Sequence, residues 1–254
     1  MTSPLYVIGD IHGQRDKLIN LLGNAGLIRE DLAWIGGNSR LWFVGDFFDR
    51  GDDGIGVVDL VMRWQKEAAA VGGSVNGLLG NHEVLFLGAH RFADNGGFLS
   101  MWRRNGGQER DMQRAKGQQI AWLRNLPAMA RVDEYLLIHA DASFYREYGS
   151  TVEQVNESVS EIVRGSNIPA WERLLEQFSE RLSFASSRPD GIVRASDFLR
   201  RFGGKHIIHG HTPIQYLSDQ LNPSEPFIYS VNLCINVDGG MYLGGSGFVY
   251  QAPT

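Results

Sequence analysis

Short apolar runs that end in polar, glycine-containing loops recur along the chain. They cover residues 5–8, 41–44, 75–79, 135–138, 206–208, 232–237 and 247–250. Short apolar runs bounded by turn residues are typical of buried strands. We therefore predict a β-strand in each run.

Longer segments with apolar residues at helical spacing lie between these runs. They cover residues 14–25, 56–71, 107–126, 151–163 and 170–182. Leu18, Leu21 and Leu22 show the spacing in the first segment, and Pro127 would end the third, because proline cannot continue a helix. Strands that alternate with helices predict an α/β fold. After about residue 206 helix is sparse, which indicates an antiparallel end to the sheet.

The chain has 254 residues and no internal repeat, which suits one domain spanning 1–254. Within it, residues 142–185 are polar and show no recognisable chemical motif. We interpret this stretch as a helical cap inserted into the domain.

Composition excludes several classes of protein. A net charge of −5 without a basic patch argues against nucleic-acid binding. No run approaches the ~20 apolar residues of a membrane-spanning helix, and the start of the chain does not read as a signal peptide, so we expect a cytoplasmic protein. Cys234 is the single cysteine, which excludes an intrachain disulfide and is expected to be a buried thiol. The sequence does not indicate an oligomeric state.

Five of the seven histidines lie in compact, glycine-flanked motifs, most of which directly follow a predicted strand. The motifs cover residues 9–13, 45–51, 80–83, 138–141 and 209–212. In open α/β sheets, ligands bind at the carboxyl ends of strands. We therefore expect these polar side chains to meet at one site.

Each motif alone has an ordinary interpretation, since Asp10 and His12 suit a hydrogen-bonded turn and Asp46 with Asp49 suits a solvated loop. Together the motifs supply three histidines, two aspartates and one asparagine, a donor set that can hold two divalent ions. Two such ions carry +4, of which Asp10 and Asp46 cancel 2. The remaining positive charge would attract a phosphate dianion and lower the pKa of a bound water.

The order of these motifs resembles the phosphoprotein phosphatase branch of the calcineurin-like metallophosphoesterases. The variants His139-Ala140-Asp141 and 210–213 (Gly-His-Thr-Pro) are similar to lambda phage phosphatase-like members, and the stretch 45–87 to bacterial Shewanella-like phosphatases. The resemblance runs in motif order from residue 7 to about 248. It implies a sandwich of two mixed β-sheets flanked by helices, with a helical insertion, and hydrolysis by a hydroxide bound to two metal ions.

The resemblance also implies a role for each motif residue. The metal ligands would be Asp10, His12 and the bridging Asp46 for one ion, and Asp46, Asn81, His139 and His211 for the other. His82 would be the general acid, oriented by Asp49, and Arg50 would bind phosphate oxygens. Mn²⁺ is the metal we expect first, with Fe or Zn as alternatives.

A second phosphate-binding arginine is expected upstream of the last histidine motif. Arg188 stands at about the expected distance, although the usual neighbouring tryptophan is absent, and Arg181 and Arg173 are the alternatives. Pro213 replaces a histidine found in much of the wider superfamily, and the phosphoprotein phosphatase branch shares that departure. The histidines outside the ligand set are expected to be structural or exposed, namely His90, His206 and His209.

The leading functional interpretation is a serine/threonine phosphoprotein phosphatase whose partner is a phosphoprotein or phosphopeptide, with tyrosine activity also open. The alternative is a diadenosine tetraphosphate hydrolase, which shares the motifs. A catalytically inactive binding domain is the third hypothesis, and the complete ligand set argues against it.

Overall fold

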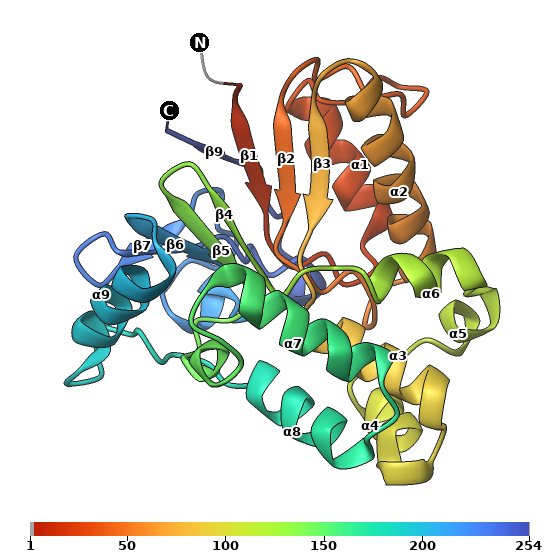
Figure 1. Cartoon of the computed structure of the whole chain (residues 1–254). Coiled ribbons are helices and arrows are strands. Elements are labelled where there is room, and N and C mark those ends of the chain that lie inside the picture. Colours follow the sequence, from red (N-terminus) through yellow and green to blue (C-terminus); the bar gives the residue numbers. More distant parts are fainter. Residues whose placement is uncertain (1–2, 254) are drawn as a thin grey trace.

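Two mixed β-sheets form the centre of the molecule in a computed structural model that describes residues 3–253 (Figure 1). The predicted domain 1–254 includes residues 1, 2 and 254, which lie outside that range. The first sheet has the order β3-β2-β1-β9 and the second β4-β5-β6-β8-β7. The strands are β1 (Leu5–Ile8), β2 (Arg40–Phe43), β3 (Ser74–Gly77), β4 (Met129–Val132), β5 (Tyr135–Ile138), β6 (His206–His209), β7 (Phe227–Tyr229), β8 (Cys234–Asn236) and β9 (Tyr250–Ala252).

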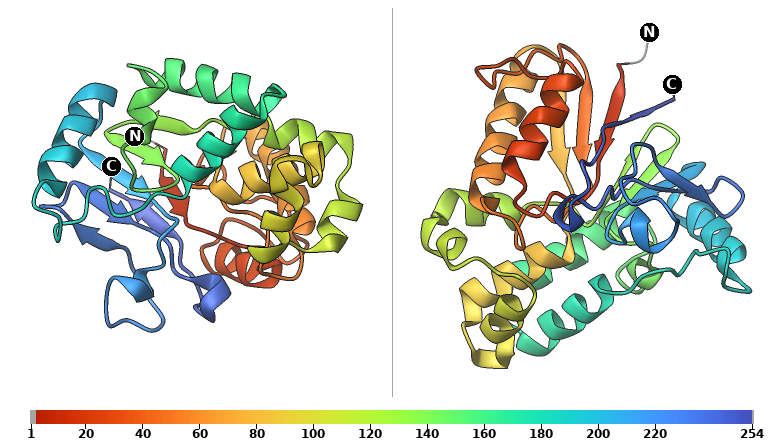
Figure 2. Two further views of the ribbon diagram at one scale, coloured as in Figure 1. Left: turned by 90° about the horizontal axis from the view of Figure 1, so that it is seen from below. Right: turned by 180° about the vertical axis from the view of Figure 1, so that it is seen from behind.

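Each sheet contains three parallel strands; the second sheet has an antiparallel strand at both edges and the first sheet at one edge. β1, β2 and β3 are parallel, as are β5, β6 and β8, whereas β9, β4 and β7 pair antiparallel. The first and last strands are neighbours, since Leu5 pairs with Ala252 (Figure 2). The carboxyl ends of β1, β2 and β3 point toward the second sheet and the helices beyond it (Figure 1). The loops that leave both sheets can therefore meet.

Helices cover the outer sides of this arrangement. α1 and α2 lie along the first sheet, and α3, α4, α7 and α8 gather below the strand ends (Figure 1). The α-helices are α1 (Arg15–Asn24), α2 (Gly54–Ala70), α3 (Asn81–Phe92), α4 (Phe98–Arg104), α5 (Glu109–Arg114), α6 (Gly117–Leu123), α7 (Val152–Arg164), α8 (Ile168–Phe178) and α9 (Gly191–Phe202). Short 3₁₀ helices are η1 (Asn95–Gly97), η2 (Phe144–Glu147), η3 (Ile214–Tyr216) and η4 (Met241–Leu243).

One large apolar cluster joins the first sheet to the helices of the predicted cap. Val155, Val159 and Val163 recur every four residues on α7 and are buried, as one face of a helix requires. They share a cluster with Trp171 of α8 and Trp64 of α2. The segment 142–185 therefore packs onto the main core, and its status as an insertion stays an interpretation.

The predicted strands were found, with their ends shifted where the backbone turns. The predicted strand 232–237 begins only at Cys234, because the residues before it, Val231 and Asn232, have positive φ values of 56° and 63°. The predicted strand 247–250 is instead β9, because Gly247 has a φ of 70°, outside the strand region. β4 and β7, the antiparallel edges of the second sheet, were not predicted.

The helical prediction was wrong in two respects. The segment 107–126 holds two short helices, because Ala115 and Lys116 adopt extended conformations between α5 and α6. α3, α4 and α9 were missed altogether. α3 is buried over most of its length, so its apolar residues do not mark one face and the helical period is hidden.

Candidate metal centre and active site

The motif residues lie in the loops that follow five parallel strands. Asp10 and His12 follow β1, Asp46 follows β2, His139 follows β5, and His211 follows β6. Asn81 and His82 form the first turn of α3, directly after β3, and Asp49 and Arg50 lie on the loop after β2. The predicted ligands lie at the junction of the two sheets, and all of them are buried except Asn81, which is half-buried.

Asp46 occupies the centre of this arrangement. Its Oδ2 lies 3.6 Å from His12 Nε2 and its Oδ1 lies 3.5 Å from His139 Nε2. Two groups of side chains close enough to hold a metal ion share this carboxylate, one with His12 and His82 and the other with His139 and His211. Asp46 is thus the only member common to both groups within residues 3–253.

Backbone carbonyls orient two of the histidines. Nδ1 of His12 lies 2.9 Å from the Phe48 carbonyl oxygen, and Nδ1 of His139 lies 2.9 Å from that of Val44. A ring nitrogen that faces a carbonyl must donate its proton, which leaves the Nε2 lone pair of the neutral ring directed into the cluster. Burial lowers the pKa of both histidines and so favours this neutral form.

Hydrogen-bond acceptors converge on the side of His139. Its Nε2 lies 3.1 Å from Nδ1 of His211 and 2.9 Å from Oδ1 of Asn81. Nε2 of His211 faces the Ser179 carbonyl at 3.4 Å, so Nδ1 carries its free lone pair. Lone pairs that face each other at this distance repel unless a cation lies between them, and these residues therefore fit a divalent ion.

Buried carboxylates on the other side of Asp46 repel one another. Burial raises the pKa of Asp10, and the neighbouring Asp238 and Asp46 raise it further. Asp238, which belongs to none of the sequence motifs, has a pKa raised by burial to about 7, and its buried Oδ2 has no hydrogen-bond partner within residues 3–253. Divalent cations beside Asp10 and Asp46 would offset this excess of negative charge.

Asp10 also joins the two sheets. Its Oδ1 accepts a hydrogen bond of 2.9 Å from the His211 backbone N–H, and its Oδ2 lies 3.8 Å from His12 Nε2. Gly210 allows this approach, because a Cβ at that position would lie 2.3 Å from Asp10 Oδ1. Gly80 has the same role for Asp46, whose Oδ1 would lie 2.2 Å from an added Cβ. Glycine at both positions is a steric requirement of the site.

His82 is part of a buried chain of hydrogen bonds. Its Nδ1 lies 2.6 Å from Asp49 Oδ2, and Asp49 Oδ1 accepts a hydrogen bond of 2.7 Å from the Trp102 indole N–H. Burial favours the neutral imidazole, but Asp46 and the bond to Asp49 outweigh it and hold the pKa of His82 above its usual value. Trp102 lies on α4, a helix that was not predicted, so the sequence gave no signal for its contact.

Arg50 lies beside the metal-ligand group that contains His12, Asp46 and His82. One guanidinium nitrogen lies 2.8 Å from His12 Nε2 and the other 3.0 Å from His82 Nε2. The guanidinium stacks over the Tyr242 ring at 4.1 Å from its centroid, a cation–π contact. Arg50 is exposed at the same time, so an anion from solvent can reach it.

The cap contributes to the site, although residues 142–185 show no recognisable chemical motif in the sequence. The Phe178 ring stacks near His139, with centroids 6.5 Å apart, and Ser179 reaches His211 as described above. Burial lowers the pKa of His139 and His211, and the charge of Arg181, two residues after Ser179, contributes to the lowering. Arg188 is exposed, and within residues 3–253 no hydrogen bond or ion pair joins its side chain to the cluster.

Strained backbone is concentrated at the site. Positive φ values occur at five of its residues, none of them glycine, namely His12 (47°), Asp46 (54°), Asp49 (68°), Arg50 (64°) and His211 (68°). Such conformations cost free energy and persist where the surroundings impose them, often at functional sites. Glu83 supplies part of that constraint, because its carboxylate accepts backbone N–H bonds from Asp46 (2.8 Å), Phe47 (2.8 Å) and Gly80 (2.9 Å).

The remaining histidines and the cysteine behave largely as expected. His90 is exposed, and Nδ1 of His206 lies 2.7 Å from the Asn232 carbonyl. His209 is buried outside the metal-ligand groups, with its Nε2 2.8 Å from the Tyr229 hydroxyl. Cys234 is a buried free thiol.

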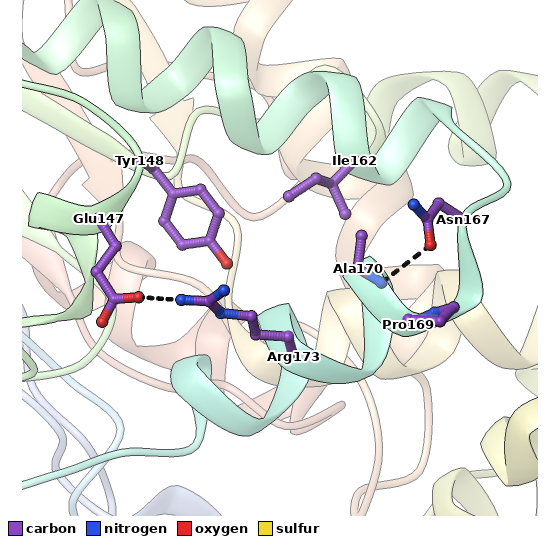
Figure 3. A pocket seen from close by; sticks show the side chains of 7 residues that line it. All are labelled: Glu147, Tyr148, Ile162, Asn167, Pro169, Ala170 and Arg173. Atoms are coloured by element: carbon purple, nitrogen blue, oxygen red, sulfur yellow. Dashed lines mark hydrogen bonds and ion pairs between the residues drawn. The ribbon is translucent and has the colours of Figure 1, made fainter.

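A cavity of about 380 Å³ lies in the cap and is separate from the cluster. Tyr148, Ile162 and Arg173 are among its walls, and the ion pair between Glu147 and Arg173 crosses one end (Figure 3). Arg173, one of the alternatives for the second phosphate ligand, is thus engaged by Glu147. None of the residues around this cavity belongs to the metal-ligand groups.

The chain belongs to the calcineurin-like phosphoesterase family, whose family model matches residues 3–215. It is therefore a metallophosphoesterase, a hydrolase whose His/Asp cluster is compatible with two metal ions. The predicted α/β fold and the predicted family are confirmed.

Two curated relatives differ in the activity that their names state. Shewanella-like protein phosphatase 1 of Plasmodium berghei is 33% identical over 137 residues, which is 53% of this chain and 38% of that protein. The chain thus spans less than half the length of that relative. Bis(5'-nucleosyl)-tetraphosphatase PrpE of Anoxybacillus flavithermus is 26% identical over 253 residues, covering 97% of this chain and 89% of that protein.

Solved structures support the fold. The cold-active protein-tyrosine phosphatase of a psychrophilic Shewanella species has a TM-score of 0.75 at 24% identity, covering 98% of this chain and 75% of that chain. At this identity the likeness concerns architecture alone. Within residues 3–253, no helix combines the length and the apolarity that a membrane span requires.

Proposed function

We propose that this protein is a metal-dependent phosphomonoesterase that removes phosphate from phosphoproteins, with serine and threonine residues as its first targets. The observation that carries the proposal is the pair of ligand groups sharing Asp46, one of which includes His82, with Arg50 and Asp49 in contact with that histidine. Two divalent ions bound there would activate water and neutralise charge on the phosphoryl group. The proposed ligands are Asp10, His12, Asp46, Asn81, His139 and His211, with Mn²⁺ as the first metal to test.

His82 is the proposed general acid. A leaving alkoxide needs a proton, and an imidazole whose pKa lies near the working pH donates one efficiently. Asp49 accepts from Nδ1 of His82, so Nε2 is the nitrogen left to face the reaction. Trp102 fixes Asp49 in turn and so limits the rotation of the imidazole.

Arg50 and Arg181 are the proposed phosphate-binding arginines, with Arg181 in place of Arg188. Arg50 spans His12 and His82 from one side of Asp46. Arg181 follows two residues after Ser179, whose carbonyl lies 3.4 Å from Nε2 of His211 in the other ligand group. Two guanidinium groups on opposite sides can hold the phosphoryl oxygens in the charge-assisted geometry that arginine favours.

Dinucleoside polyphosphate hydrolysis is the second candidate. Its support is the PrpE relative, which aligns with nearly the whole chain. We place the phosphomonoesterase proposal first because two arginines, Arg50 and Arg181, are proposed for the site, a number that suits one phosphoryl group. A tetraphosphate chain would require more cationic groups along its length.

A paired substrate assay tests these proposals. Protein stripped of metal and then supplied with Mn²⁺ is incubated with a phosphoserine peptide, a phosphotyrosine peptide and diadenosine tetraphosphate. We expect phosphate release from the phosphoserine peptide to exceed nucleotide release from the dinucleotide at equal concentrations. Faster cleavage of the dinucleotide would assign the second function, and inactivity on all three would refute the phosphoesterase proposal.

The cytoplasmic location stays a prediction.

A further inference from the structure

A buried carboxylate outside the proposed ligand set holds the segment that follows α8. Asp141 is fully buried, and its Oδ1 accepts a hydrogen bond of 2.8 Å from the backbone N–H of Leu182. Its own backbone carbonyl accepts another of 2.8 Å from the N–H of Ser183. Asp141 thus fixes two consecutive residues directly after Arg181. Its carboxylate belongs to neither metal-ligand group.

Tyr229, at the end of β7, supports Asp141 from the opposite side. Its hydroxyl donates to Asp141 Oδ2 at 2.8 Å and lies 2.8 Å from Nε2 of the buried His209. Nδ1 of His209 lies 3.0 Å from the Gly210 carbonyl, one residue before His211. The network therefore connects the segment after α8 to the loop that carries one of the proposed ligands.

The end of β7 holds the following residues of the same segment. The Ser230 backbone N–H donates to Ser186 Oγ at 3.0 Å, and the Ser230 hydroxyl donates to the Phe184 carbonyl. Leu182 has a φ of 64°, a left-handed conformation that a leucine adopts only when its surroundings impose it. The hydrogen bonds to Asp141 supply this constraint, because they hold the backbone N–H groups of Leu182 and of the next residue, Ser183.

The position of Arg181 depends on this turn. Arg181 is itself exposed, and it lies between Ser179, whose carbonyl is 3.4 Å from His211 Nε2, and the strained Leu182. A long exposed side chain loses conformational entropy when it binds an anion. A backbone that is already fixed adds no further loss, so the entropic cost of binding is lower. A released turn would let Arg181 move away from the Ser179–His211 contact.

We propose that Asp141, Tyr229 and His209 form a clamp that positions Arg181 for binding the phosphate group of the substrate. The inference rests on the proposed function, in which Arg181 is a phosphate ligand. The three clamp residues act through the backbone of Leu182 and Ser183, so they are positioning residues. They make the affinity for phosphate depend on a network that lies outside the metal-ligand groups.

The test is a double-mutant cycle on the Mn²⁺-loaded full chain, with binding of inorganic phosphate measured by titration calorimetry. Loss of a charge-assisted contact in Arg181→Ala should weaken phosphate binding about tenfold or more. Asp141→Ala should cause most of the same loss. The double variant should bind phosphate no more weakly than Arg181→Ala, because the clamp acts through that arginine.

Conservative variants separate positioning from general destabilisation. Asp141→Asn keeps an acceptor for the Leu182 N–H and should bind phosphate more tightly than Asp141→Ala. Tyr229→Phe removes one hydroxyl and keeps the test available if Asp141→Ala does not fold. Tyr135→Phe is the matched control, since its hydroxyl bonds the Pro253 carbonyl at 3.0 Å and its strand, β5, is not a neighbour of β7 in the second sheet, and it should bind phosphate like the wild type. The metal content of every variant is measured and should stay unchanged.

Two results would overturn the clamp. One is wild-type phosphate affinity in both Asp141→Asn and Tyr229→Phe together with a loss in Arg181→Ala. The other is a double variant whose loss equals the sum of the single losses in binding free energy. Failure of the proposed function gives a different result, namely a metal-loaded wild type that hydrolyses no phosphoester. The phosphate affinities of the variants can still be compared in that case.

Discussion

At the scale of single residues, Asp46 carries more of the site than any other side chain. Burial alone would raise its pKa, but the positive charge that the surrounding histidines carry when protonated, His139 first among them, holds the pKa below its usual value. The carboxylate is therefore ionised and available to both ligand groups. Its backbone conformation, with a φ of 54°, is held by Glu83 and by the approach of Gly80.

Asp46→Asn should abolish turnover. The substitution removes one negative charge between the two ligand groups and so weakens both proposed metal sites. Metal content measured by mass spectrometry of the purified variant should fall below that of the wild type, along with phosphate release from para-nitrophenyl phosphate. A variant that kept both metals and full activity would show that Asp46 does not bridge them.

His82→Asn should separate acid catalysis from metal binding. We expect unchanged metal content and a fall in kcat of about 10²–10⁴-fold on a phosphoserine peptide, whose leaving group is poor. The loss should be much smaller on para-nitrophenyl phosphate, whose leaving group needs little protonation. Equal losses on both substrates would contradict the acid role.

The pH profile tests the same residue. A general acid acts in its protonated form, so kcat should fall as pH rises through the pKa of His82, which Asp46 and Asp49 hold above its usual value. Asp49→Asn removes one of these stabilising groups and should move the falling limb to lower pH. The measurement is kcat against pH on phenyl phosphate, and an unmoved limb would exclude the Asp49 contribution.

At the scale of elements, the motifs that precede or follow a strand could be predicted from sequence, and the helices that support them could not. The loop after β1 was found because glycine, aspartate and histidine stand at its start. Trp102 was missed because α4 carries no motif, and its contact with Asp49 arises only when α4 packs against α3. The site's φ values at Asp46 and Asp49 likewise depend on tertiary contacts.

Gly80→Ala tests how closely β3 and the Asp46 loop must approach. The added Cβ would lie 2.2 Å from Asp46 Oδ1 and 2.8 Å from Glu83 Oε2, so the carboxylate must move. We expect metal affinity to fall about 10–100-fold, the usual effect of disturbing groups that orient metal ligands. Gly23→Ala is the control, since nothing lies within 4 Å of its added Cβ in α1, and it should keep wild-type metal affinity.

At the scale of the whole molecule, the site joins the two sheets and the cap. Asp10 from the first sheet accepts a hydrogen bond from His211 of the second, and Ser179 reaches the same histidine from the end of α8. Ligands contributed by both sheets make metal binding a link between them. Metal binding should therefore stabilise the folded chain as a unit.

Thermal unfolding measures this link. A ligand at 100 times its Kd stabilises the native state by about 2.7 kcal/mol, which for a chain of this size raises Tm by about 5 °C or more. Saturating Mn²⁺ should produce such a shift in the metal-stripped wild type and a much smaller one in Asp46→Asn. Equal shifts in the two proteins would place the stabilising metal elsewhere.

Anomalous diffraction from a crystal grown with Mn²⁺ tests the central claim most directly. The account predicts two manganese peaks about 3.5–4 Å apart, the spacing typical of two-metal hydrolases, on either side of the Asp46 carboxylate. One peak should lie toward His12 and Asp10, and the other among Asn81, His139 and His211. A single peak, or peaks away from Asp46, would contradict a two-metal site at this junction.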